Sequence, residues 1–202
     1  MSDRPASRGP WSSSGSTPPQ FDAGALGMTV FIVALTMLFA AGIVIYLLMR
    51  HMHQPWPPRG FPALPATLWL STLDIVFSSI AMQGAVLAAR RGDKIGLRRN
   101  LVATLLSGMG FLGLQSYAWY KIWTQVAVAA DRSSTYLEMF YAMTGLHAVH
   151  VLGGLVPLVI VTVVAYQGRY GRKKHAVVRY TAIYWHFLAA VWCAVFTVVY
   201  LL

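Results

Sequence analysis

Five long apolar stretches, separated by short polar or charged segments, dominate the pattern along this chain. Each stretch is long enough to cross a bilayer as a helix, because about 20 residues span a hydrocarbon core of roughly 30 Å. The predicted spans are residues 26–49, 66–89, 101–123, 137–166 and 179–202. Pro157 lies inside the longest span and marks a site where that helix can kink. The pattern predicts an all-α, polytopic membrane protein in which one bundle of five transmembrane helices accounts for residues 25–202.

The first 24 residues differ from the rest of the chain because they are rich in Ser, Pro and Gly. They contain no apolar segment of the kind that forms the centre of a signal peptide. A segment of this composition buries too little apolar surface to offset the entropy of ordering it. We therefore expect residues 1–24 to form a disordered cytoplasmic tail.

The composition supports a membrane location, since only 11% of the residues are charged, against about 25% in an ordinary soluble domain. A net charge of +10 could suggest nucleic acid, but the distribution of the charge argues against that partner. If the tail and the second and fourth loops share one side of the membrane, that side holds twelve of the 16 Lys and Arg residues. This bias is the positive-inside signal, so it predicts a cytoplasmic N-terminus and an outside C-terminus. The same basic residues would also attract anionic lipid headgroups.

One polar stripe runs along the second predicted span. Thr67, Ser71, Asp74 and Ser78 recur at spacings of four, three and four, which places them on one side of a helix. Such a side faces the interior of a bundle, where hydroxyl groups can hydrogen-bond between helices. Asp74 is either an interhelical hydrogen-bond acceptor or part of a proton relay, and we favour the acceptor.

The fourth predicted span carries Thr144, His147 and His150 at spacings of three, so the three side chains share one broad face. The favoured interpretation is that the histidines hydrogen-bond to neighbouring helices or to lipid headgroups. The alternative is haem ligation, with His186 of the last span as a further ligand. Two histidines on one helix cannot ligate one iron from opposite faces, so we expect no haem in this chain.

Further chemical signals are weak. His51 and His53 flank Met52 in the first external loop and could bind a metal ion, but a solvated interfacial turn is the favoured interpretation. Cys193 has no partner in the chain for a disulfide, and a lone cysteine inside a span is usually a small apolar side chain. The chain has no glycine-rich phosphate loop, no paired carboxylates and no nucleophile motif, so we expect no catalytic centre.

Two histidine motifs give a more specific indication. They are Thr144-Gly-Leu-His-Ala-Val-His-Val151, and Tyr184-Trp-His-Phe187 followed by Trp192. With weaker support from Trp56-Pro-Pro-Arg-Gly60 in the first external loop, they resemble subunit III of haem–copper cytochrome c oxidases. The resemblance covers about residues 25–202, and five spans resemble the short form of that subunit.

The resemblance implies a non-catalytic subunit of a proton-pumping terminal oxidase in a bacterial cytoplasmic membrane. Its haem and copper would belong to partner subunits I and II, whereas this chain would pack against subunit I, bind phospholipid and support proton uptake and stability during turnover. The residues that would make structural, lipid or subunit contacts are His147, His150, Tyr184, Trp185, His186, Trp192, Asp74 and Ser78.

The chain departs from the family pattern at three positions. Leu35, Ala118 and Ala189 stand where the resemblance leads us to expect membrane carboxylates, whereas Asp74 stands where the family is usually apolar. A role as a carboxylate-based proton antenna is therefore not expected here.

The alternatives to a subunit III function are an accessory subunit of a quinol oxidase or nitric oxide reductase system, a stand-alone haem cytochrome, or a small transporter. A transporter would be expected to show internal repeats, and none is found in this sequence.

Overall fold

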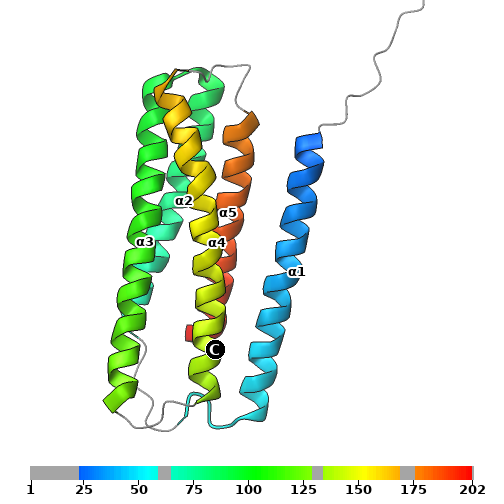
Figure 1. Ribbon diagram of the computed structural model, residues 1–202, viewed down its shortest axis with the longest axis vertical. Helices are drawn as coiled ribbons and strands as arrows, with labels where there is room; N and C mark the ends of the chain where they lie inside the picture. The colour runs from blue at the N-terminus through cyan, green and yellow to red at the C-terminus, as the bar shows by residue number, and fades with distance from the viewer. Residues whose placement is uncertain (1–22, 59–64, 129–133, 169–175, 202) are drawn as a thin grey trace, which may run out of the picture.

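The computed structural model describes residues 23–58, 65–128, 134–168 and 176–201. Within these residues the chain forms five α-helices followed by a π-helical turn and contains no strand (Figure 1). They are α1 (Ala23–Met52), α2 (Thr67–Arg91), α3 (Lys94–Val128), α4 (Thr135–Tyr166), α5 (Ala176–Phe196) and the turn Thr197–Leu201. All five helices are long and apolar enough to cross a membrane, so the prediction of an all-α membrane bundle is confirmed. The predicted tail lies outside the described residues apart from its last two positions.

The tight turn between α2 and α3 is the main difference from the predicted spans. The third span was expected from residue 101, but α3 begins at Lys94. Gly92 ends α2 in the left-handed conformation, with φ of 75°, and the backbone N–H of Asp93 donates to the carbonyl of Ala88 at 2.9 Å. The Asp93 side chain then accepts a hydrogen bond from the backbone N–H of Gly96 at 2.9 Å. The expected basic loop therefore consists mostly of helix ends.

Helix α1 makes the fewest contacts with the rest of the bundle. It lies at one edge of the bundle (Figure 1), where Phe31 in its first half packs against Tyr184 of α5 with the ring centres 5.5 Å apart. Its buried side chains, Leu35, Phe39 and Tyr46, lie on one face. Trp56 fixes the C-terminal end of α1, because its Nε1 donates to the Tyr46 hydroxyl at 3.1 Å and its ring packs edge-on against Tyr136 of α4.

Two buried tryptophans of α5, Trp185 and Trp192, form the centre of the remaining four helices. Glycines on α3 and α4 leave room for Trp185. A Cβ atom on Gly108 would lie 2.8 Å from its ring, and one on Gly154 would lie 3.3 Å from it. The absence of these two side chains therefore lets α5 pack closely against both neighbours, as small residues do at membrane helix interfaces.

Arg98 connects α3 to the C-terminus of α4. Its guanidinium donates to the carbonyl groups of Ala165 at 3.2 Å and Tyr166 at 3.1 Å, and lies 5.2 Å from the centre of the Tyr166 ring. A cation at a helix C-terminus satisfies carbonyl groups that have no partner within the helix. Arg98 therefore stabilises the bundle in addition to contributing to the positive-inside signal.

Candidate functional site

The two central tryptophans donate hydrogen bonds from α5 to α2. Trp185 Nε1 donates to Ser78 Oγ at 3.0 Å, and Ser78 in turn donates to the carbonyl of Thr104 on α3 at 3.2 Å. Trp192 follows Trp185 by seven residues on α5, and its Nε1 donates to Thr72 Oγ1 at 3.0 Å. Three predicted residues, Ser78, Trp185 and Trp192, thus take part in two sets of hydrogen bonds that together join α2, α3 and α5. In an apolar environment such bonds fix which helix faces meet.

Only some residues of the predicted polar stripe of α2 bond to other helices. Asp74 and Ser78 reach α3, but Ser71 donates to the carbonyl of Leu68 in its own helix at 2.9 Å. Thr67 Oγ1 has no hydrogen-bond partner among the described residues. Ser71 and Ser78 are buried, as expected for a side that faces the bundle interior, but only Asp74 and Ser78 of the stripe bond to another helix. A serine or threonine hydroxyl can be satisfied by a carbonyl one turn earlier, so it needs no neighbouring helix.

The stripe also omitted polar residues of α2 that do reach α5. Thr72 accepts from Trp192, and Ser79 and Gln83 both contact His186. Their spacing of seven and four residues places Thr72, Ser79 and Gln83 on one side of α2. Thr72 and Ser79 are seven residues apart, as are Trp185 and Trp192 on α5. This shared spacing is the sequence signal that could have identified the polar residues of α2 that reach α5.

Asp74 accepts a hydrogen bond from α3. Ser107 Oγ donates to Asp74 Oδ1 at 2.5 Å, and Asp74 Oδ2 is buried beside Gly110 without a hydrogen-bond partner among the described residues. This geometry supports the acceptor interpretation, since the contact joins two helices through one oxygen of the carboxyl group. Gly110 provides the space, because a Cβ there would lie 3.3 Å from Oδ2.

Asp74→Asn is expected to leave thermal stability and turnover nearly unchanged, because the amide keeps the shape and an acceptor oxygen for Ser107. Asp74→Leu removes the acceptor and should lower stability modestly, by about 0.6 kcal/mol, the average for hydrogen bonds in membrane bundles. Thermal unfolding in detergent measures both variants. Ser116→Ala is the matched control, because among the described residues the Ser116 hydroxyl bonds only to the carbonyl of Leu112 in its own helix. A large loss of proton pumping in Asp74→Asn, at normal stability, would instead assign the carboxyl group to a proton relay.

His147 is completely buried in an aromatic cage. Its ring lies 5.1 Å from that of Trp192, 5.7 Å from Phe111 and 6.2 Å from Phe39, measured between centres. Neither ring nitrogen has a hydrogen-bond partner among the described residues. The expected hydrogen bond to a neighbouring helix is therefore wrong for His147. The sequence could not indicate this, because the three rings come from three other helices.

His150 bonds within its own helix. Its Nδ1 lies 2.7 Å from the carbonyl of Leu146, and its side chain makes no hydrogen bond to a neighbouring helix among the described residues. The expected bond to a lipid headgroup stays a prediction. The backbone carbonyl of His150 instead accepts from the Tyr184 hydroxyl of α5 at 3.0 Å, and its ring packs against Phe39 of α1. His150 thus lies where α1, α4 and α5 meet.

His186 is the predicted histidine that does bond to a neighbouring helix. Its Nδ1 lies 2.6 Å from Ser79 Oγ and its Nε2 lies 3.3 Å from Gln83 Oε1, both on α2. His147, by contrast, packs among rings of α1, α3 and α5. The two histidines therefore occupy different environments, which does not fit a shared haem.

The donor set also argues against a metal centre. The described part of the chain contains no group of three or more His, Cys, Asp or Glu residues placed to hold a metal ion. His51 and His53 are exposed at the end of α1, where His53 Nδ1 lies 3.0 Å from the carbonyl of Met49. His51 and His53 therefore have no third His, Cys, Asp or Glu ligand beside them among the described residues.

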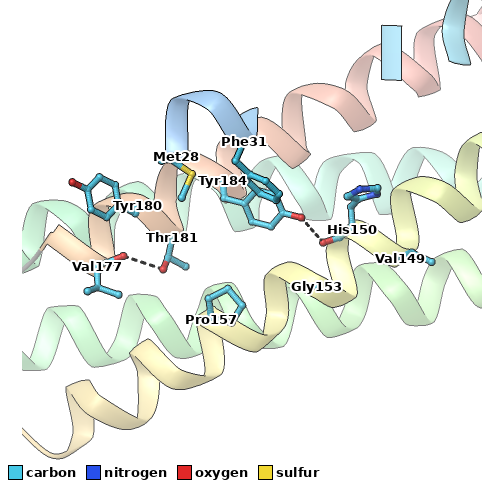
Figure 2. A pocket seen from close by; sticks show the side chains of 10 residues that line it. All are labelled: Met28, Phe31, Val149, His150, Gly153, Pro157, Val177, Tyr180, Thr181 and Tyr184. Carbon is cyan, nitrogen blue, oxygen red and sulfur yellow. Dashed lines mark hydrogen bonds between the residues drawn. The ribbon is translucent and has the colours of Figure 1, made fainter. Parts of the chain in front are cut away.

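A cavity of about 530 Å³ lies between α1, α4 and α5 (Figure 2). Its walls are mainly apolar and include Met28, Phe31 and Pro157. Two of its three hydroxyl groups bond to backbone carbonyls, since Tyr184 donates to His150 and Thr181 donates to Val177. The volume lies within the range of about 300–1,000 Å³ that is usual for ligand sites, and the lining suits an apolar ligand.

A second hollow of about 230 Å³ lies beside the cavity, between α1 and α5. Met28 and Tyr180 line both spaces. Arg179 lines the smaller one, and its guanidinium lies 5.1 Å from the centre of the Tyr180 ring. The apolar cavity thus adjoins a basic side chain near the N-terminus of α5.

The three positions at which carboxylates were expected from the resemblance are all buried. Leu35, Ala118 and Ala189 are 7%, 0% and 6% exposed. Leu35 lies one turn before Phe39, which packs against both histidines of α4. Leu35 therefore presents an apolar side chain to the bundle interior one turn from these contacts.

The comparisons with known proteins agree with the resemblance. A family model of cytochrome c oxidase subunit III matches residues 14–202. Cytochrome c oxidase subunit 3 of Thermostichus vulcanus is 32% identical over 182 residues, which cover 90% of this chain and 88% of that protein. The probable cytochrome c oxidase subunit 3 of Mycobacterium tuberculosis (strain ATCC 25618 / H37Rv) is 35% identical over 186 residues, which cover 87% of this chain and 86% of the relative. The chain therefore belongs to the cytochrome c oxidase subunit III family.

Proposed function

We propose that this chain is the non-catalytic subunit III of a proton-pumping haem–copper terminal oxidase that reduces O₂ with electrons from cytochrome c. Haem and copper belong to partner subunits I and II, and this chain packs against subunit I. Family membership supports this assignment, and so does the use of the buried polar groups. Ser78, Trp185 and Trp192 are engaged in bonds that hold helices together, which is a structural role.

The cavity between α1, α4 and α5 is the observation that carries the role we propose. We infer that it holds an acyl chain of a phospholipid. The cavity follows α5 from Val177 to Tyr184, a rise of about 10 Å at 1.5 Å per residue. Arg179 at the adjoining hollow supplies a positive charge near the headgroup, and attraction of this kind contributes about 1 kcal/mol per basic residue near the surface.

This chain would support proton uptake through the lipid and water that it orders, and not through a carboxylate relay. The apolar side chains at Leu35, Ala118 and Ala189 support this interpretation, because none of them can exchange a proton. An ordered layer of lipid beside the catalytic subunit would keep its proton entry hydrated and its cofactor site closed during turnover.

Removal of the chain tests the proposed function. The depleted oxidase should keep its haem spectrum and its initial rate of electron transfer, and its activity should then decay faster over successive turnovers. Absorption spectra and O₂ consumption of the complex, purified with and without the chain, measure these quantities. Loss of haem at normal levels of subunit I would contradict a non-catalytic role.

Gly153→Leu tests the lipid site itself. Gly153 lines the cavity, and a Cβ there would be no closer than 4.0 Å to its nearest neighbour, so a larger side chain enters the cavity without a clash at its base. The variant should retain less phospholipid phosphorus per purified complex. Gly113→Leu is the matched control on α3, where a Cβ would meet nothing within 4 Å. Equal phosphorus in both variants and the wild type would argue against this site.

The proposed orientation places the N-terminus in the cytoplasm. In a Cys193→Ser background, Gly60→Cys should react with a membrane-impermeant maleimide added outside, and Ile95→Cys should not. The reason is the excess of Lys and Arg in the tail and in the second and fourth connections. The reverse pattern of labelling would invert the topology.

A further inference from the structure

We propose that a transmembrane helix of the partner oxidase subunit packs on one face of α2 and α5, centred on Gln83 and His186. This face, called here the α2–α5 polar face, comprises Ser79, Gln83, His186, Ala190 and Ala194. The inference rests on the proposed function, since it assumes that the chain assembles with a catalytic partner. It adds which side of the bundle meets that partner and what chemistry the partner presents.

The polar side chains of this face lie at hydrocarbon depth. Gln83 precedes Arg91, the last residue of α2, by eight positions, which is about 12 Å along the helix axis. His186 follows Ala176, the first residue of α5, by ten positions, or about 15 Å. The hydrocarbon core is roughly 30 Å thick, so both residues lie well below the headgroups.

Gln83 is exposed on the surface of the bundle, and its hydrogen bonding is incomplete. His186 uses both ring nitrogens, one with Ser79 Oγ and one with Gln83 Oε1. The amide NH₂ of Gln83 makes no hydrogen bond to any described residue of this chain. Lipid tails offer no acceptor, and polar groups in membrane helices are normally satisfied by other helices. The exposed amide therefore favours a protein neighbour over lipid.

The rest of the face suits close helix packing. Ala190 and Ala194 follow His186 by four and eight residues, so they continue the same side of α5, and both are exposed. Small side chains at a spacing of four let a second helix approach closely. The exposed side chains of α4 are large and apolar by comparison, among them Val149, Val156 and Ile160, as expected for a surface covered by lipid.

The occupant is therefore a helix that carries a hydrogen-bond acceptor at the level of Gln83. A serine, threonine, asparagine, glutamine or carboxyl side chain would serve, because each can accept from the amide NH₂. This acceptor also explains why a glutamine stands on an exposed part of a transmembrane helix.

Photocrosslinking in the assembled complex tests the proposal. A benzophenone amino acid at position 190 should crosslink to the catalytic subunit, whereas the same group at position 156 on α4 should yield only lipid adducts. Gln83→Leu should also reduce the haem that co-purifies with the tagged chain, by roughly threefold at limiting partner, the effect of one average interhelical hydrogen bond. The matched control Val156→Leu should leave the haem unchanged.

The outcomes separate this inference from the proposed function. If the wild-type chain co-purifies without any oxidase subunit, the proposed function fails. If it co-purifies normally but position 190 crosslinks only to lipid or to a second copy of this chain, the assignment of the face is overturned. A crosslink to the catalytic subunit from position 156 and not from position 190 would place the partner on α4 instead. If Gln83→Leu leaves the amount of co-purified haem unchanged, the Gln83 amide is not part of the contact.

Discussion

Gly108→Ala is expected to destabilise the bundle by about 1–3 kcal/mol, the usual effect of an added group in a filled core. A Cβ at this position would lie 2.8 Å from the ring of Trp185 and 3.1 Å from Leu155. Trp185 cannot move away easily, because its Nε1 is bonded to Ser78 and its ring also packs near Gly154. The methyl group added at position 108 should therefore push α3 and α5 apart.

Gly113→Ala is the matched control for this prediction, since it lies on the same helix and a Cβ there would meet nothing within 4 Å. Alanine is favoured over glycine inside a helix by about 1 kcal/mol, so this variant should be neutral or stabilised. Thermal unfolding of both variants in detergent gives the comparison. Equal stability of the two variants would show that α3 and α5 are not packed as closely as described.

Trp185→Ala is expected to have the larger effect, a loss of about 3–5 kcal/mol, because it empties the centre of the bundle. Trp185 is 1% exposed and contacts α2, α3 and α4. Trp185→Phe keeps most of the ring and removes the bond to Ser78, so it should cost only about 0.5–1.5 kcal/mol.

Trp123→Ala provides the control for Trp185, because Trp123 is 56% exposed and lies near the C-terminal end of α3. It should change the unfolding temperature little. Resistance of the chain to proteolysis in native membranes gives a second measurement without detergent. A Trp185→Ala variant as stable as Trp123→Ala would contradict the central position of Trp185.

The sequence predicted the number of helices well because apolar length is a local property. The bounds were less accurate where short-range capping decided them. Gly92 and Asp93 reverse the chain within two residues, so α3 begins seven residues before the predicted span at residue 101. Hydropathy does not detect this turn, because the basic residues around it remain helical.

The partners of the polar residues were harder to predict because they depend on how the helices are arranged. Asp74 was correctly expected to accept a hydrogen bond between helices, but the spacing of polar residues along α2 could not identify Ser107 of α3 as the donor. The aromatic cage of His147 requires rings from α1, α3 and α5, which lie far apart in the sequence. Periodicity identifies the inward face of a helix, whereas tertiary packing decides which residue that face meets.

Purification of a tagged form of this chain from native membranes in a mild detergent tests the proposed assignment most directly. We predict that two oxidase subunits and a haem Soret band co-purify with it. When stronger detergent dissociates the chain, the Soret band should remain with the larger subunit, and the isolated chain should show none. A Soret band that follows the isolated chain and disappears in His147→Ala or His150→Ala would contradict the account.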